Sequence, residues 1–123
     1  MAFDEYLAER ISRVLDERKV IYFQKKMMGG LVFMVDNKMC LGIARDKNSG
    51  EDRLMVRIGE EAIQSNSHKD GIRPMEFTGR PMKDYSFIYP EGYDMEEDLE
   101  FWVDLALTFN PQAKKSIKRS KKK

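Results

Sequence analysis

The side chains that could carry catalytic chemistry are few and lie far apart in this 123-residue sequence. The single histidine, His68, falls in a polar segment, and the single cysteine, Cys40, falls in an apolar run. A zinc site needs about four protein ligands, or three and a water molecule. A nucleophile needs a base within hydrogen-bond reach. Neither residue has such companions nearby in sequence, so we predict a solvated histidine, a buried apolar cysteine, no metal and no cofactor.

A group of carboxylates near the C-terminal end is the densest set of candidate acid–base residues. They fall within a segment of helical periodicity, and several lie off its apolar stripe: Glu96, Glu97, Asp98, Glu100 and Asp104. Acidic side chains in the first turn of a helix are stabilised by the helix dipole. We therefore interpret these residues as a solvated helix face and predict that the protein is not an enzyme.

Two glycine-containing segments superficially resemble phosphate-binding loops. Residues 25–30 read Lys-Lys-Met-Met-Gly-Gly, and residues 79–83 read Gly-Arg-Pro-Met-Lys. Neither matches the P-loop or the dinucleotide-binding pattern, and glycines more often mark turns or close backbone approaches. A small-ligand or enzymatic site at Gly29-Gly30 and Gly79-Arg80-Pro81 stays open as the alternative, and a pocket that joins both segments would favour it.

The charges of the chain are divided unevenly along it. The whole sequence has 22 basic and 21 acidic residues, but residues 111–123 hold seven basic residues and no acid, which leaves 15 basic against 21 acidic residues in 1–110. We expect a folded domain over 1–110 and a disordered basic tail over 111–123. The tail could bind DNA or RNA phosphates, only solubilise the protein, or fold back on the acidic helix. Its basic residues are Lys114, Lys115, Lys118, Arg119, Lys121, Lys122 and Lys123.

The elements that would position these residues can be read from the periodicity. Phe3, Leu7, Ile11 and Val14 recur at helical spacing and predict an N-terminal helix. Short runs rich in β-branched and aromatic residues predict about five strands, at 20–24, 31–35, 39–44, 53–58 and 85–89, with a short helix at 60–64. A last helix is expected to begin after Asp94 as its cap and to end before Pro111.

Consecutive strands with helices at both chain ends predict an α+β fold: a mostly antiparallel sheet of about five strands with the N- and C-terminal helices packed on it. The sheet is expected to be apolar on both faces, because Leu31 and Phe33 alternate with the equally apolar Val32 and Met34. A second apolar face needs a cover, either a helix of the same chain or a second subunit. The nine methionines could fill core gaps or line an adaptable binding surface.

Four stretches of the chain carry a resemblance to a known family. They are residues 3–11, 28–42 (which begin Met-Gly-Gly-Leu-Val-Phe), 53–59, and 73–83, which read Arg-Pro-Met-Glu-Phe-Thr-Gly-Arg-Pro-Met-Lys. On these stretches the chain resembles the N-terminal domain family of TfoX (Sxy), the bacterial regulator of competence genes. Met28 stands where members of this family usually have phenylalanine.

The resemblance implies an α+β fold of the secretion-chaperone type and, in long members, positive control of DNA-uptake genes. It does not imply an enzyme. Long members continue into a C-terminal domain, and we expect this chain to be a stand-alone member that lacks it.

The most specific of these stretches, 73–83, has a physical interpretation as well. Pro74 and Pro81 fix their φ angles and Gly79 favours a turn, so we predict a rigid non-helical loop. This loop would present Phe77 and two methionines beside cations, or it would only plug the open side of the sheet. The candidate interaction residues are Met28, Gly29, Gly30, Arg73, Pro74, Met75, Phe77, Thr78, Gly79, Arg80, Pro81, Met82 and Lys83.

Together, these patterns predict a non-enzymatic interaction module, and the resemblance implies a role as a transcriptional co-regulator. It would bind a protein partner through the methionine-rich loops, and the tail would add charge attraction and contact with nucleic acid. A homodimer whose apolar sheet face is only an assembly surface stays open. A lone cysteine, an acidic start without an apolar signal region, and the lack of an apolar run of about 18 residues predict a cytoplasmic protein that does not bind membranes.

Overall fold

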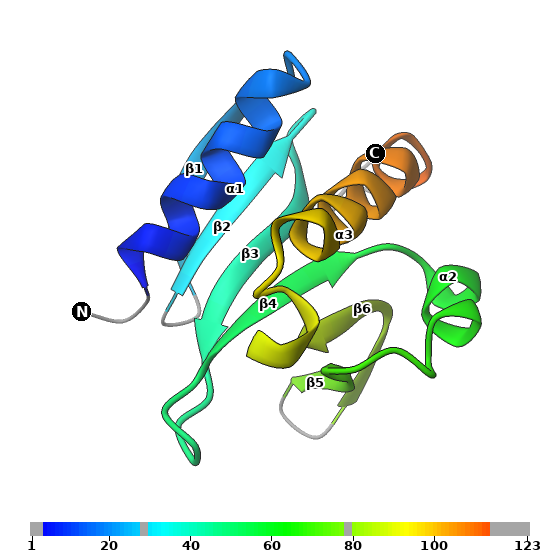
Figure 1. The fold of residues 1–123 in the computed structure, drawn as a ribbon. Helices are drawn as coiled ribbons and strands as arrows, with labels where there is room; N and C mark the ends of the chain where they lie inside the picture. The colour runs from blue at the N-terminus through cyan, green and yellow to red at the C-terminus, as the bar shows by residue number, and fades with distance from the viewer. Residues whose placement is uncertain (1–3, 28–29, 78–79, 114–123) are drawn as a thin grey trace.

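The computed structural model describes residues 4–27, 30–77 and 80–113 of the chain. Its elements, in chain order, are α1 (Glu5–Glu17), β1 (Tyr22–Met27), β2 (Gly30–Val35), β3 (Lys38–Arg45), β4 (Asp52–Arg57), α2 (Glu60–Ser65), β5 (Ile72–Phe77), β6 (Arg80–Ile88), the 3₁₀ turn η1 (Pro90–Gly92), α3 (Glu96–Phe109) and the 3₁₀ turn η2 (Asn110–Gln112). Over these residues the strands form one antiparallel sheet of six strands in the order β1-β2-β3-β4-β6-β5 (Figure 1). The predicted α+β class is confirmed, with one strand more than expected.

The additional strand comes from the segment that we predicted to be a rigid loop, and that prediction is wrong. Residues 72–77 form β5, which pairs with β6 to make a hairpin. Pro74 does not prevent this, because β5 is the edge of the sheet and an edge strand tolerates a residue without an N–H donor. Pro81 lies in the part of β6 that precedes its pairing with β4, which covers residues 85–88 of β6. Pro74 pairs with Ser86, whose hydroxyl donates to the Arg73 carbonyl at 2.8 Å, and Pro81 pairs with Glu76.

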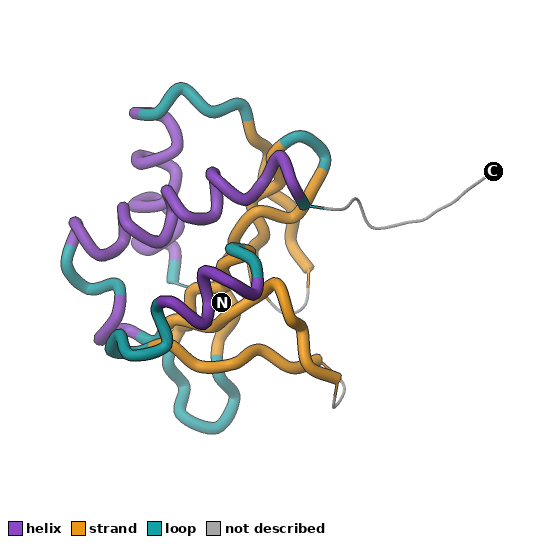
Figure 2. Tube along the Cα trace, turned by 90° about the vertical axis from the view of Figure 1, so that its right-hand side faces the viewer, coloured by secondary structure: helices purple, strands orange, loops and turns teal. Residues whose placement is uncertain are grey.

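The main core lies between the helices and one face of the sheet, which we call the first face. Figure 2 shows the helices together on one side of the strands. Side chains from α1 and α3 meet side chains from the strands in a cluster that includes Ile11, Leu15, Phe33, Leu54 and Trp102, each no more than 1 % exposed. Burial of this kind contributes about 25 cal/mol for each Å² of apolar surface removed from water.

The two long helices are also joined by charged contacts. The Arg18 guanidinium at the end of α1 donates to Glu100 Oε1 at 3.2 Å and to Asp104 Oδ2 at 3.0 Å. Arg10 donates to the Tyr93 and Asp94 carbonyls and pairs with Glu96. Three of the carboxylates that we interpreted as a solvated helix face therefore have a structural role as partners of α1.

The two long helices begin differently, and the expected cap of the last helix is not observed. The acidic start of α1 is stabilising, and Asp4 is its N-cap, with the carboxylate accepting from the Tyr6 N–H at 2.9 Å. Asp94 does not cap α3. The N-cap is Met95, which makes no side-chain capping bond, and Asp94 belongs to the preceding turn, where its N–H donates to the Pro90 carbonyl.

The end of the described chain is fixed against the sheet. Lys38 is buried, and its ammonium donates to the Asn110 carbonyl at 2.9 Å. The Asn110 amide donates to the Val35 carbonyl at 3.2 Å, and Ala113 is buried. These contacts hold residues 110–113 against the rest of the folded chain.

Candidate interaction face

The face of the sheet that points away from the helices, which we call the second face, is built by strand alternation. In β4, Leu54 and Val56 belong to the main core, so the side chains between and beside them, Arg53, Met55 and Arg57, point to the opposite side. The register of the sheet places Met55 opposite Phe87 and Arg57 opposite Tyr85 on β6. Two arginines, a methionine and two aromatic rings thus meet on adjacent strands.

A separate apolar cluster lies on the second face. Its buried members are Val32, Ala44, Met55 and Met75, and its partly buried members are Met34, Met39, Tyr85 and Phe87. These residues come from β2, β3, β4, β5 and β6. The prediction that the sheet is apolar on both faces is therefore confirmed, and four methionines belong to the second cluster. The same contacts give Met75 a structural role, because it is 3 % exposed and does not protrude as expected.

The centre of this cluster depends on a glycine. A Cβ atom at Gly42 would lie 2.9 Å from Met55 Cε and 2.5 Å from the Leu31 carbonyl oxygen. Contacts below 3.0 Å do not occur at real Cβ atoms, so only glycine leaves room for the methionine methyl above β3. Gly42 pairs with Met55 across the two strands, and the sequence therefore keeps the second face closely packed at this point.

Arginine side chains cover the aromatic rings of the second face. The Arg53 guanidinium carbon lies 3.8 Å from the centre of the Phe87 ring, and that of Arg57 lies 5.2 Å from the centre of the Tyr85 ring. A guanidinium over an aromatic ring is attracted by the ring quadrupole. Burial raises the pKa of the Tyr85 hydroxyl, which therefore stays protonated at neutral pH. The arginines supply part of the cover that an apolar face requires.

A polar contact closes one end of the second face. The Tyr89 hydroxyl donates to Asp46 Oδ2 at 2.7 Å, and the Asn48 N–H donates to Asp46 Oδ1 at 2.9 Å. These two donors lower the pKa of the Asp46 carboxyl. The pKa of the Tyr89 hydroxyl is raised, first by burial and then by its bond to Asp46. Arg73 lies 5.5 Å from the centre of the Tyr89 ring, so a third guanidinium reaches this end.

None of the helices in residues 4–27, 30–77 and 80–113 lies over the second face: α1, α2 and α3 all contribute side chains to the main core. The partly buried methionines and rings therefore share this face with the arginines. This arrangement can contact a partner through apolar surface and guanidinium groups together. A sequence signal for this face went unused in the prediction. Cationic or aromatic residues alternate with core residues in β4 (Arg-Leu-Met-Val-Arg) and in β6 (Tyr-Ser-Phe).

The residues of the candidate interaction loop are divided between strands and undescribed positions. Gly30 begins β2, Arg73, Pro74, Met75 and Phe77 lie in β5, and Arg80, Pro81, Met82 and Lys83 lie in β6. Met28, Gly29, Thr78, Gly79 and residues 114–123 lie outside the described residues. The backbone requires glycine at position 30, since a Cβ atom there would lie 1.9 Å from the Ile43 carbonyl oxygen.

The residues considered first for catalysis lie apart. Cys40 is buried and His68 is exposed, as predicted. Burial raises the pKa of the Cys40 thiol to about 12, so the reactive thiolate is strongly disfavoured. Within the described ranges, no group of three or more histidine, cysteine, aspartate and glutamate residues is arranged to hold a metal ion. No helix in the described part of the chain is long and apolar enough to cross a membrane.

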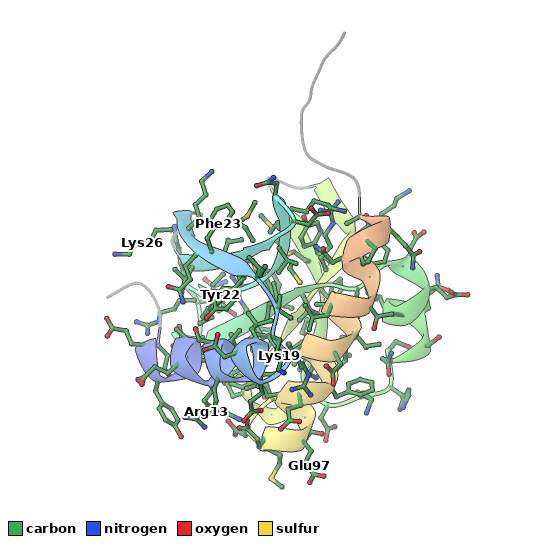
Figure 3. All side chains as sticks on the ribbon, turned by 90° about the horizontal axis from the view of Figure 1, so that it is seen from above. Arg13, Lys19, Tyr22, Phe23, Lys26 and Glu97 are labelled. Carbon is green, nitrogen blue, oxygen red and sulfur yellow. The ribbon has the colours of Figure 1, made fainter. Side chains whose placement is uncertain are left out.

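A groove of about 740 Å³ lies elsewhere, between α1 and the edge strand β1. Ser12 on α1 accepts a hydrogen bond from the Gln24 amide across it, and Arg13 and Lys26 also line it. Figure 3 shows Lys26 and Phe23 on this outer strand. The groove does not include Gly30, Arg80 or Pro81, so it does not join the two glycine segments.

Comparison with protein families now decides the relationship. The family model described as TfoX N-terminal domain matches residues 22–110. The chain belongs to the TfoX N-terminal domain family. The matched range begins at β1 and ends at Asn110 in η2, so it covers the whole sheet and α3 and leaves out α1. The predicted family is therefore confirmed. No curated protein matches the chain.

The second face lies within the part of the chain that the family model matches. Every residue of its apolar cluster, from Val32 to Phe87, lies within the matched range. The arginines that cover its rings do so too. The TfoX N-terminal domain is not a known enzyme family.

Proposed function

We propose that the protein is a non-enzymatic interaction module whose second sheet face binds a protein partner. The observation that supports it is the apolar cluster around Met34, Met39, Met55 and Phe87, which no helix among the described residues covers. Partly exposed methionines adapt their shape to different partners because the thioether side chain is flexible. Apolar surface of this kind on a folded domain marks an interaction site.

The family relationship supports the biological context of this proposal. The name of the matched family refers to TfoX, and long members of the kind that the sequence resembles control DNA-uptake genes. We therefore propose that the module acts in the cytoplasm as a transcriptional co-regulator. In this proposal residues of Met28–Gly30 and Arg73–Lys83 take part in binding the partner. The basic residues of 114–123 add charge attraction, including to nucleic acid.

The test is affinity capture from native lysate with matched variants. Met34→Gln replaces a partly buried methionine of the second face, and Met95→Gln makes the same change at a residue that is 60 % exposed and precedes α3. The wild-type chain and Met95→Gln are expected to retain the partner after nuclease treatment, and Met34→Gln is expected to lose it. Equal capture by both variants, or loss of capture on nuclease treatment, would contradict the proposal.

A homodimer is the competing explanation for an uncovered apolar face. Light scattering at two protein concentrations distinguishes it, because a dimer that buries this face dissociates on dilution or when Met34→Lys places a charge in it. A monomer at both concentrations favours a partner of another kind. Catalytic turnover of a metabolite, abolished by one polar substitution, would instead favour the enzymatic alternative.

A further inference from the structure

The charges on the second face differ in sign from those on the helical side. Three guanidinium groups, those of Arg53, Arg57 and Arg73, lie over rings on this face. The exposed Lys25 of β1 is paired with Val32 and shares its side of the sheet. Among the described side chains of this face, the carboxylate of Asp46 lies at one end and is bonded to Tyr89.

The acidic residues gather on the opposite side of the molecule. Glu96, Glu100 and Asp104 lie on α3, where they pair with arginines of α1. Residues 1–110 have 15 basic and 21 acidic residues, so the positive second face belongs to a body of net negative charge. A body charged in this way orients an approaching partner through complementary local potentials.

We propose, on the basis of the proposed function, that the segment bound by the second face is acidic: a protein segment in which carboxylate side chains flank apolar ones. The apolar side chains contact Met34, Met39 and the edges of the aromatic rings. The carboxylates contact Arg53 and Arg57, since guanidinium and carboxylate groups form charge-assisted hydrogen bonds that are about twice as strong as neutral ones. Both chemistries are present within one small area.

A second copy of the chain fits this face poorly. Face-to-face packing would bring Arg53, Arg57 and Arg73 of both copies into one interface. Like charges brought together in this way cost several kcal/mol. Two carboxylates near these arginines are already engaged within the chain: Asp46 accepts from Tyr89, and Glu91 lies 3.8 Å from Arg73.

Single-stranded nucleic acid also fits this face poorly. Proteins that bind it offer open aromatic faces on which bases stack. Here the faces of Phe87 and Tyr85 are covered by Arg53 and Arg57. The surface between them is thioether and aliphatic, which suits apolar side chains of a protein segment. The net negative charge of 1–110 also repels a long polyanion.

The experiment selects random 12-residue peptides displayed on phage against the full chain and measures the composition of those enriched. Selected peptides are then titrated against Arg57→Gln, against Arg57→Lys, and against Arg13→Gln, which removes an exposed cation on α1. We expect enrichment in aspartate and glutamate next to apolar residues. We expect about tenfold weaker binding to Arg57→Gln, partial recovery with Arg57→Lys, and unchanged binding to Arg13→Gln.

The contrary outcomes separate this inference from the proposed function. Peptides that lose binding to Met34→Gln but carry no excess of acid overturn the inference and leave the proposed function standing. Selected peptides that bind Met34→Gln as tightly as the wild-type chain, or a selection that enriches no peptide, overturn both the inference and the proposed function. Oligo-dT binding that Arg57→Gln weakens, or concentration-dependent dimers that Arg57→Gln disrupts, overturns the acidic-segment assignment in favour of nucleic acid or a second copy.

Discussion

Replacing Met55 with alanine tests whether the second face of the sheet is a packed cluster of its own. Met55 is 1 % exposed, although no helix of the described chain lies above it. The substitution removes the thioether that fills the space over Gly42, where the neighbouring strand has no side chain to replace it. We therefore expect a cavity rather than a local collapse.

The expected loss follows from the size of the removed group. Truncation of a buried methionine to alanine lowers the free energy of unfolding by about 2–5 kcal/mol, and more where the cavity stays open. The second face borders solvent and can relax in part, so we expect about 2.5 kcal/mol, near the lower end of that range. For a domain of this size, that loss lowers Tm by about 10 °C.

The assay is urea unfolding followed by circular dichroism, with Met95→Ala as the matched control. Met95 is 60 % exposed, so its truncation is expected to change the free energy of unfolding by no more than about 0.5 kcal/mol. Met55→Leu, which nearly conserves volume, is expected to lose less than about 1.5 kcal/mol. A loss for Met55→Ala no larger than that for Met95→Ala would refute the packed second face.

Four further measurements test other parts of the structure and of the proposal. The Cys40 thiol, with its pKa raised to about 12, is expected to resist iodoacetamide at pH 8 in the native protein and to react once urea unfolds it; rapid native labelling would contradict its burial. Lys38→Ala removes one of two donors to the buried Asn110 carbonyl, the other being the Ala113 N–H, and is expected to lower the free energy of unfolding by about 1 kcal/mol in urea titrations, whereas no change would contradict a stabilising role of that contact. The full chain is expected to bind duplex DNA weakly, with a slope of about −6 for log K against log salt concentration, and deleting 114–123 is expected to abolish this binding. Binding with an unchanged slope after the deletion would remove nucleic acid from the proposal. Two hydrogen bonds lower the pKa of the Asp46 carboxyl in the folded protein. The stability that this group contributes is therefore present above the ordinary carboxyl pKa and is lost as the pH falls through the lower folded value. In thermal melts from pH 6 to 3, we expect Tm to depend less on pH in Asp46→Asn than in the wild-type chain.

The fold class could be predicted because the deciding signals are local. The spacing of Leu7, Ile11 and Val14 fixes the buried side of α1 without reference to the rest of the chain. Leu99, Trp102 and Ala106 do the same for α3. By contrast, β5 was missed, because Pro74 and Pro81 favour a loop unless the strand is known to be a sheet edge, and strand order depends on pairing between distant segments.

The composition of the second face was predictable, but its cover was not. The alternation of Val32 and Met34 with core residues already indicated two apolar faces. That Arg57 lies over Tyr85 depends on the register between β4 and β6, which no local pattern of either strand contains. The same holds for the pairing of Arg18 with Asp104, since each looks like an ordinary exposed charge in sequence.

The most direct test of the account is NMR of methionine methyl groups during titration with a peptide selected on the full chain. Met34 and Met39 report on the second face, and Met95 reports on the helical side as an internal control. The account predicts that the Met34 and Met39 signals shift in proportion to the bound fraction while the Met95 signal stays in place. Binding that moves Met95 and leaves Met34 and Met39 unchanged would contradict it.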